Sequence, residues 1–303
     1  MSSSLPDGYR CRPVKPADAS VINALIVAAD EAVQGWSDSS EQDILDWWRL
    51  LDLEQDSWIV EDSGIAAYAV AFPHADSLDV DGYVHPSHKR RGLGSWLVAR
   101  GEERAVGRGL PTVHGWALAQ DADARRLFEE RGYAEVRRFY RMLIELDAPP
   151  PEPEWPEGFR VVTFEHEDAR AIHAAFLEAF ADEWNFVAMP FEQWYEVRVA
   201  EPDFDPTLWF VVRRGDEIAA VLRADLERSG AGYVAGIGVL KKWRRRGLGL
   251  ALLRQVFGEF YRRGQPRIAL GVDAQNPTGA TKLYERAGMH VAYEGIAFAK
   301  ELT

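Results

Sequence analysis

Glycines and basic residues recur together at two places in this chain. The run Val239–Gly249 carries three consecutive arginines and then Gly247-x-Gly249, and Val84–Gly94 repeats this pattern 155 positions upstream. Glycines let backbone N–H groups converge on an anion, and a following helix adds its positive N-terminal end. Arginines add charge-assisted hydrogen bonds to phosphate oxygens. We therefore interpret both runs as pyrophosphate-binding loops.

Composition restricts the classes of protein to which this chain can belong. It has 303 residues, 47% of them hydrophobic, and a net charge of −13 with a pI near 5.1. This length favours two domains, and the acidic balance argues against nucleic-acid partners. Cys11 stands alone, which excludes an internal disulfide framework and suits a reducing compartment. With no signal-peptide pattern and no long apolar run, we expect a cytoplasmic protein with no membrane partner and no metal.

Internal similarity extends well beyond the two loops. Gly8-Tyr9-Arg10 parallels Gly158-Phe159-Arg160, and Ser57-Trp58-Ile59-Val60 parallels Leu208-Trp209-Phe210-Val211. The matched segments keep their order at nearly constant offsets, which is the pattern of a duplicated domain. Five prolines in residues 148–156 favour a stiff extended linker. We therefore predict an N-terminal domain over residues 1–147, a linker over 148–157 and a C-terminal domain over 158–303.

Each half has the pattern of a mixed α/β domain. Apolar runs with alternating polarity predict strands, and apolar residues at helical spacing predict helices. In the second half the order β-α-β-β-β-α-β-α-β places the glycine loop after a strand, at the edge where α/β sheets bind ligands. The predicted strands of this half are 159–164, 209–213, 217–225, 233–239 and 267–272, and its predicted helices are 168–181, 248–261 and 277–286.

On these motifs the chain resembles the GNAT acetyltransferase superfamily, with two such domains in tandem. The coenzyme A signature of that family is matched by Arg244, Gly247 and Gly249, whereas the first copy has Lys89 at the first position. The layout is similar to that of the mycothiol synthase family, whose second domain is catalytic. The resemblance implies two mixed, mostly antiparallel sheets flanked by helices, and acetyl-CoA as the acyl donor. The family's downstream pattern is matched by Asn276, Ala280, Leu283, Tyr284, Glu285 and Gly288.

The resemblance also implies which residues bind acetyl-CoA. Backbone groups of Ile237 and Val239 would hold the acyl-pantetheine arm, with an N–H polarising the thioester carbonyl. Gly236 and Gly238 suit such an approach, although close packing against a helix also requires small residues in a strand. The other binding residues implied are Gly238, Arg244, Arg245, Arg246, Gly247, Leu248, Gly249, Leu250 and Asn276 in the second domain, and Val84, Lys89, Arg90, Arg91, Gly92, Leu93, Gly94 and Ser95 in the first.

Tyr284 is the candidate general acid. The thiol of coenzyme A has a pKa of about 8.5 and an unperturbed tyrosine one of about 10, so full proton transfer to the thiolate is uphill by roughly 2 kcal/mol. A hydrogen bond that strengthens as the thiolate forms is enough to assist the reaction. Without the resemblance, a tyrosine on an amphipathic helix would be interpreted as a packing residue.

The general base is less defined by the sequence. An ammonium acceptor must lose a proton before it can attack a thioester. Many relatives carry an acidic residue on the strand before the glycine loop, but residues 233–239 contain none. Glu183 is the first candidate, with Asp225, Asp182 or water alone as alternatives. Each of these carboxylates can equally be a solvated surface charge.

Aromatic and acidic residues alternate ahead of the strand that begins at Trp209. In related enzymes this region forms the wall of the acceptor site, and aromatic faces beside carboxylates suit a cationic amine. A helix core with an acidic exterior explains the same pattern equally well. The residues concerned are Trp184, Phe186, Phe191, Trp194 and Tyr195, with Asp182, Glu183, Asp203 and Asp205.

The first domain lacks the expected acid. It has Phe128 where Tyr284 stands and Asp121 where Asn276 stands, so we expect it to be catalytically degenerate. The sequence therefore predicts an N-acetyltransferase that moves an acetyl group from acetyl-CoA to an amine of a small molecule or peptide, with catalysis in the C-terminal domain. We expect a monomer built as a pseudo-dimer, or a homodimer. The alternative is a non-catalytic acyl-CoA sensor or interaction protein on the same fold; the glycine spacing excludes a Rossmann fingerprint and a P-loop.

Overall fold

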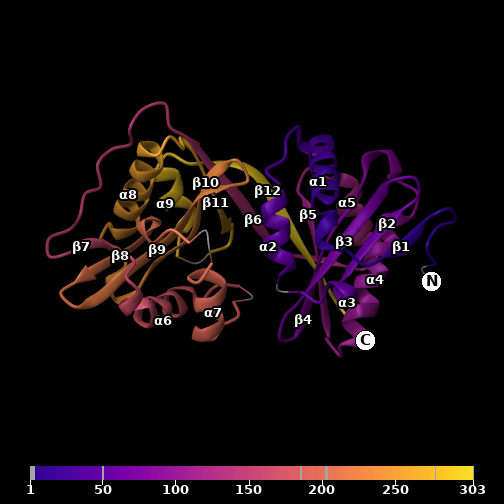
Figure 1. The fold of residues 1–303 in the computed structure, drawn as a ribbon, viewed down its shortest axis with the longest axis horizontal. Coiled ribbons are helices and arrows are strands. Elements are labelled where there is room, and N and C mark those ends of the chain that lie inside the picture. The colour runs from indigo at the N-terminus through magenta and orange to yellow at the C-terminus, as the bar shows by residue number, and fades with distance from the viewer. Residues whose placement is uncertain (1–3, 50, 185, 202–203, 277, 303) are drawn as a thin grey trace. The chain divides into compact units, whose positions relative to one another are not determined.

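The chain folds into two compact units, which are drawn as a ribbon in Figure 1. The computed structural model describes residues 4–49, 51–184, 186–201, 204–276 and 278–302. Unit 1 comprises Met1–Phe139 and Tyr293–Thr303, whereas unit 2 comprises Tyr140–Ala292. Within the described ranges, no helix combines the length and the apolar character that crossing a membrane requires.

Unit 1 contains a mixed sheet with the strand order β1-β2-β3-β4-β5-β12. Neighbouring strands are antiparallel except β4 and β5, which are parallel. The strands are β1 (Arg10–Arg12), β2 (Ser57–Glu61), β3 (Ile65–Pro73), β4 (Ser77–Val84), β5 (Thr112–Leu118) and β12 (His290–Glu301). The helices are α1 (Ala19–Gln34), α2 (Glu41–Trp48), α3 (Leu53–Asp56), α4 (Leu93–Gly107) and α5 (Ala122–Glu130).

Unit 2 repeats this arrangement with the strand order β7-β8-β9-β10-β11-β6. The pairs β7–β8, β8–β9 and β9–β10 are antiparallel, and β10 is parallel to β11. The strands are β6 (Ala134–Glu145), β7 (Arg160–Thr163), β8 (Trp209–Arg214), β9 (Glu217–Arg228), β10 (Ala231–Val239) and β11 (Arg267–Asp273). The helices are α6 (Ala169–Phe180), α7 (Phe191–Arg198), α8 (Leu248–Arg262) and α9 (Ala280–Arg286).

The last strand of the chain completes the sheet of unit 1, which the sequence did not reveal. Residues 295–301 of β12 pair with residues 112–118 of β5, and the second half of β6 lies beside β11 in unit 2. The predicted linker, residues 148–157, therefore lies inside unit 2. As limits of the two duplicated segments, 1–147 and 158–303 remain our proposal. The compact units differ from these segments because the last strand of each segment joins the sheet of the other one. Strand β6 has the place beside β11 that β12 has beside β5.

The predicted strands and helices of the second half are confirmed to within a few residues. Two differences concern its helices. The helix predicted over 277–286 begins only at Ala280, and Pro277 lies outside the described residues. Helix α7 was predicted only as one of two interpretations of the aromatic segment, and without bounds; it begins after Pro190 and buries Trp194 against α6 and β8.

Alternate residues of β8 face two separate cores of unit 2. Phe210 and Val212 pack in the core that α8 fills, whereas Trp209 and Val211 pack with residues of α6 and α7. Figure 1 shows α8 and α9 over one face of the sheet and α6 and α7 over the other. This alternation follows from the twofold period of a strand that is buried on both faces.

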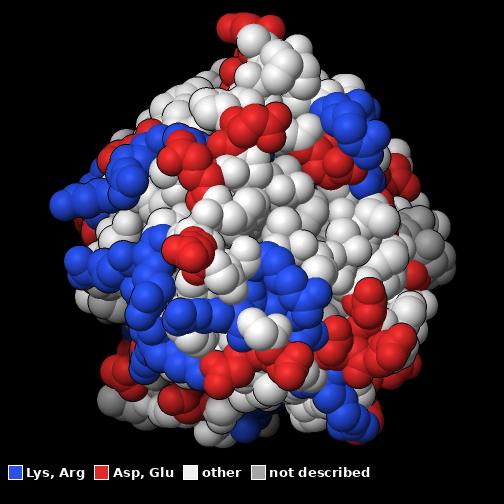
Figure 2. Space-filling view, turned by 90° about the vertical axis from the view of Figure 1, so that its left-hand side faces the viewer, with Lys and Arg blue, Asp and Glu red and all other residues white. Residues whose placement is uncertain are grey.

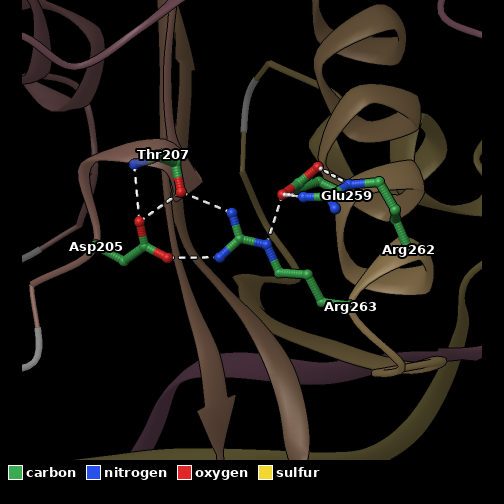
Figure 3. Close-up of polar contacts among 5 residues, drawn as sticks. All are labelled: Asp205, Thr207, Glu259, Arg262 and Arg263. Atoms are coloured by element: carbon green, nitrogen blue, oxygen red, sulfur yellow. Dashed lines mark hydrogen bonds and ion pairs between the residues drawn. The ribbon is translucent and has the colours of Figure 1, made fainter.

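A cluster of charged side chains fixes the end of α8 to the turn before β8 (Figure 3). The Arg263 guanidinium donates to Asp205 Oδ2 at 2.5 Å and to Thr207 Oγ1 at 2.6 Å, and it also bonds Glu259. Burial opposes ionisation of Asp205, but hydrogen bonds from Thr207 and Arg263 outweigh it and hold the pKa of Asp205 below its usual value. Hydrogen bonds from Arg262 and Arg263 likewise lower the pKa of Glu259.

Replacing Arg263 with alanine is expected to lower the free energy of unfolding by about 2 kcal/mol at pH 7, because it leaves two half-buried carboxylates without their donor. Since the pKa of Asp205 and of Glu259 is lowered in the folded state, their contribution is present above the unfolded pKa near 4 and is lost as pH falls. Urea denaturation at pH 7 and at pH 3 should show the difference from wild type shrinking at the lower pH. Arg262→Ala, at an exposed position, should change stability by less than about 0.5 kcal/mol; an equal loss in both variants would contradict this account.

Candidate active site

The two parallel strands of unit 2 separate along their length. Strands β10 and β11 are in register at Gly232↔Ile268 and Tyr233↔Ala269, and in the described structure no ladder pair joins them beyond Tyr233. From there β10 continues to Val239 in register with β9 alone. Apart from the Val239 carbonyl, to which Arg244 donates, backbone groups of Ile237–Val239 on the β11 side are thus available to a ligand. Unit 1 opens in the same way, because β4 and β5 pair only as far as Val80↔Gly115.

Irregular pairing of β10 with β9 accompanies this separation. The register shifts between Ala231 and Tyr233 and again between Val234 and Gly236. Such bulges bend a strand and increase its twist. They turn the second half of β10 away from β11 and towards the loop that follows.

The two glycines of β10 have different surroundings. A Cβ at Gly238 would lie 2.5 Å from the Cβ of Ala179 in α6, so helix packing alone requires a glycine there. A Cβ at Gly236 would meet Phe180 at 3.5 Å and Arg223 Nε at 3.6 Å, which is ordinary contact. Close packing against a helix therefore explains Gly238 but not Gly236.

The two basic loops adopt the same backbone conformation. Arg245 and Gly247 have φ values of +63° and +88°, and Arg90 and Gly92 have values of +62° and +86°. A left-handed arginine is unfavourable by about 1–3 kcal/mol, and such strain is concentrated at ligand sites. Because α8 begins at Leu248 and α4 at Leu93, each loop leads directly into the N-terminus of a long helix. The side chains of Leu248 and Leu93 are buried, so only their backbone can face an anion.

The second glycine of each loop brings two helices together. A Cβ at Gly249 would lie 2.8 Å from Leu283 of α9, and one at Gly94 would lie 3.0 Å from Leu127 of α5. Contacts this short leave no room for a larger residue. Gly249 therefore sets the distance between the loop helix and the helix that carries Tyr284.

Basic side chains of the second loop divide between two roles. Arg244 donates through Nε to the carbonyl oxygen of Val239 at 3.0 Å, which fixes the loop to the end of β10. Arg245 and Arg246 are exposed, and the Arg246 guanidinium lies 5.6 Å from the centre of the Trp243 ring. Figure 2 shows Lys and Arg side chains gathered in a band on one face of the molecule, although the net charge is −13. Arg245 and Arg246 therefore present positive charge at the loop, where it can attract an anion.

Tyr284 is buried in the core that α8 fills. Burial raises the pKa of its phenol, and the nearby Glu183 carboxylate and Tyr233 raise it further. Among the described residues its hydroxyl has no hydrogen-bond partner. The phenol therefore keeps its proton at neutral pH and can donate it.

Of the three candidate bases, Glu183 is the one that forms a hydrogen bond with another predicted site residue. Its Oε1 accepts a hydrogen bond of 2.7 Å from Asn276 Nδ2, and its charge acts on Tyr284. Asp182 instead forms a 2.9 Å ion pair with Lys241. Asp225, on β9, lies close enough to Arg223 to affect the pKa of that guanidinium.

The aromatic segment ahead of β8 is mainly a packing feature. Trp194 is buried with Phe191 and Tyr195 against α6 and β8, whereas Phe186 is exposed. Of the acidic residues, Asp205 pairs with Arg263, and Asp203 lies outside the described residues. The interpretation as a helix core therefore accounts for the buried members of this segment.

Unit 1 carries matched differences at the equivalent positions. Lys89 Nζ lies 3.4 Å from Asp121 Oδ2, so the two residues that replace Arg244 and Asn276 bind each other. Phe128 stacks on Phe298 with ring centres 5.0 Å apart. The ring is part of the core, and it has no hydroxyl to donate.

The sequence reasoning missed two partly buried carboxylates in unit 1. Burial and the nearby Asp30 raise the pKa of Asp81 on β4 to about 7. Burial, with Asp38 nearby, raises the pKa of Asp30 on α1 to about 6 despite a 2.7 Å hydrogen bond from Ser37. Asp81 occupies the strand before the first loop, where related enzymes carry their base. Its position in the run Ser77–Val84 was the available signal.

A fold of this kind defines a class of protein. Each unit opens a parallel strand pair above a left-handed basic loop and a helix N-terminus, which is the arrangement of acyltransferases that bind the pyrophosphate of an acyl-CoA. The comparisons with known proteins identify the family. The model described as "Acetyltransferase (GNAT) family" matches residues 23–133 and 169–289. The chain belongs to this family and is an acetyl-CoA-dependent N-acetyltransferase. The two matched ranges confirm the predicted tandem arrangement, and the family confirms acetyl-CoA as the predicted acyl donor.

Individual relatives are similar over most of the chain. The mycothiol acetyltransferases of Thermobispora bispora and Thermomonospora curvata are each 34% identical, covering 68% and 76% of this chain and 70% and 76% of their own lengths. A GCN5-related N-acetyltransferase from Sphaerobacter thermophilus is 40% identical, with a TM-score of 0.87 over 98% of this chain and 97% of that one. A tandem GNAT protein from the clavulanic acid biosynthesis pathway has a TM-score of 0.77 at 17% identity, with coverage of 97% and 98%, and shares the fold.

Replacing Gly247 with alanine is expected to weaken acetyl-CoA binding at least about tenfold, because an L-residue at φ +88° distorts the loop. Titration calorimetry would measure the dissociation constant. Gly264→Ala is the matched control, since Gly264 has φ +79°, open surroundings and a place at the opposite end of α8. Both variants should lose about 1 kcal/mol of stability. Equal affinities in the two variants would show that the loop conformation does not matter for binding.

Replacing Asp81 with asparagine is expected to raise the melting temperature at pH 8 by about 2–4 °C and to change it little at pH 5. The pKa of Asp81 is raised to about 7 from an ordinary value of 3.8. Its contribution to stability is therefore present below pH 4 and is lost as pH rises through 7. Calorimetric scans across this range would measure the effect, with the exposed Asp7→Asn as control. A constant difference across pH would contradict the burial of a charge at this position.

Proposed function

We propose that unit 2 transfers the acetyl group of acetyl-CoA to the amine of a small molecule or peptide. One observation supports this most strongly. The Glu183 carboxylate, which is bonded to Asn276, lies close enough to Tyr284 to raise its pKa, at the level where β10 and β11 have separated. In this proposal Glu183 is a hydrogen-bond acceptor, and Tyr284 is a hydrogen-bond donor, on either side of the bound thioester.

Each residue has a distinct task in this proposal. Bound acetyl-CoA supplies an activated acetyl group. Backbone groups of Ile237–Val239 hold the pantetheine arm, and an N–H polarises the carbonyl. The loop Arg244–Gly249 and the N-terminus of α8 hold the pyrophosphate. Glu183 takes a proton from the acceptor amine, directly or through water, and Tyr284 donates a hydrogen bond to the sulfur.

The raised pKa of Tyr284 determines how it acts. Since burial makes its phenolate unfavourable, complete proton transfer to a thiolate is more uphill than for an ordinary tyrosine. A hydrogen bond that strengthens as charge develops on sulfur needs no complete transfer. Asn276 fixes the Glu183 carboxylate and begins the turn that leads to α9, because its Oδ1 accepts from the backbone N–H of Thr278 at 2.8 Å.

Unit 1 has a different role in the proposal. Its loop keeps the left-handed Arg90 and Gly92, which supports binding of an acyl-CoA. Phe128 offers no proton, and Lys89 is held by Asp121. We therefore assign the acetyl transfer to unit 2 alone.

The acceptor is defined only by its chemistry. Glu183 accepts one proton, which suits a primary amine. The relatives named mycothiol acetyltransferase place amines of thiol metabolism among the acceptors to be tested first. A panel of small-molecule and peptide amines, followed by release of the coenzyme A thiol, is the direct measurement.

Replacing Tyr284 with phenylalanine is expected to lower kcat about 10²-fold while leaving the dissociation constant of acetyl-CoA within about threefold, since the phenol assists only the departing sulfur. Steady-state thiol release and calorimetry would measure the two quantities. Glu183→Gln should lower kcat similarly and remove the acidic limb of the pH–rate profile.

Tyr261→Phe, on α8 of the same unit, is the matched control and should leave both constants unchanged. Full activity in Tyr284→Phe would exclude the phenol as the acid. Binding of acetyl-CoA by the wild type with no turnover on any amine would favour the sensor over the enzyme in unit 2.

A further inference from the structure

Unit 2 contains a partly buried arginine, Arg223, for which the described residues provide no hydrogen-bond or ion-pair partner. Arg223 is on β9, opposite Gly236 of β10. Its Nε would be 3.6 Å from a Cβ at Gly236, and rings of Phe176 and Phe180 in α6 lie at the same distance from that point to within 0.1 Å. The guanidinium therefore occupies the space that Gly236 leaves open, on the face of the sheet that α6 covers.

The charge of Arg223 is only partly compensated by the described residues, through Asp225 and Tyr233. In the described part of the chain it forms neither a hydrogen bond nor an ion pair. Burial, together with the nearby Arg198, lowers its pKa to about 10, so the group is still charged at neutral pH. Asp225, two residues along the same strand, raises that pKa but forms no ion pair with it. A partly buried charge of this kind is unfavourable for folding unless a group of opposite charge pairs with it.

The fold itself does not require a charge at this position. Aligning Gly92 with Gly247 places Asp81 of unit 1 against Gly236 of unit 2. Asp81 pairs in register with Val70, which packs in the core beneath α1, so the equivalent of Arg223 is an apolar residue. At the same level of equivalent sheets, unit 1 thus has an acidic residue on the loop strand and unit 2 has a basic residue on the strand paired with it.

Arg223 lies next to the proposed reaction site. Gly236 immediately precedes Ile237–Val239, which hold the acyl-pantetheine arm in our proposal. The Tyr233 hydroxyl also lies within electrostatic range of both Arg223 and Tyr284. A group bound at Arg223 would therefore belong to the same molecule that presents its amine to the thioester.

We propose that Arg223 forms an anion subsite in the acceptor pocket of unit 2, and that the acceptor is an amine carrying a carboxylate. The planar guanidinium matches a carboxylate through two parallel hydrogen bonds. Amino acids and short peptides with a free carboxylate are the corresponding substrate class. This inference rests on the proposed function, because it names the acceptor of that reaction. It also explains why a base on β10 is missing: an acid at position 236 would pair with Arg223 and close the subsite.

The test compares matched acceptors. Wild-type enzyme is assayed by thiol release with L-α-amino acids and ω-amino acids, each beside its carboxamide. We expect kcat/KM to be at least about tenfold higher for the carboxylate member of a pair. Arg223→Met should lower kcat/KM for carboxylates by about the factor of the wild-type preference, leave carboxamides within about threefold, and so abolish the preference. Arg223→Lys should keep part of it.

Two controls keep the result interpretable. Arg254→Met, on the surface of α8 where Arg254 pairs with Glu154, should keep the wild-type preference. Arg223→Met should melt at or above the wild-type temperature, because it removes an uncompensated charge. A structural arginine would instead lower the melting temperature. A clear loss of stability in Arg223→Met, or unchanged selectivity, would overturn the inference.

Binding separates this inference from the proposed function. Calorimetric titration of N-acetyl-amino acids and of their carboxamides into the coenzyme A complex needs no turnover. Tight binding of the carboxylates that is lost in Arg223→Met supports the subsite even if acetyl transfer fails. Equal affinity of wild type for the two members of each pair would disprove the subsite, whether or not the enzyme turns over.

Discussion

One constraint underlies both units: two parallel strands must pair at one end and separate at the other. In unit 2 the separation begins after Tyr233, where bulges bend β10. The connection between these strands is α8, so its N-terminus necessarily lies at the end where they part. A helix dipole and unpaired strand amides consequently meet at one place. The left-handed Arg245 and Gly247 between them complete an anion site from backbone alone.

Local patterns in the sequence were enough to predict the loops and the order of elements. Glycine spacing and the periods of apolar residues depend on residues that are near in sequence. Contacts across the fold were not predictable in this way. Asn276 meets Glu183 only because the turn after α6 and the turn after β11 open at the same edge of the sheet. The exchange of β6 and β12 leaves no local trace, because each strand keeps its place in the repeat.

The two repeats have diverged at two matching positions, and the residues at these positions have different partners in each unit. In unit 2, Arg244 bonds the carbonyl of Val239, and Asn276 bonds Glu183. In unit 1, Lys89 and Asp121 bind each other instead. In unit 1 the two opposite charges match each other, so replacing one of them alone would leave an ionic group unmatched. Divergence of this kind preserves the loop conformation, and it leaves unit 1 without the side chains that our proposal uses in unit 2.

Asp81 of unit 1 and Arg223 of unit 2 are a second difference between the two sheets. Folding favours apolar residues on the helix-covered face of a sheet, and Val70 shows that the fold accepts one beside the loop strand. Asp81 and Arg223 are nevertheless charged groups at that level, and each has a pKa shifted by burial against its charged form. Neither shift is stabilising at neutral pH. Charges that weaken the fold persist where a ligand of opposite charge compensates them, and so in our proposal the carboxylate of the acceptor compensates Arg223, where unit 1 has the apolar Val70 instead.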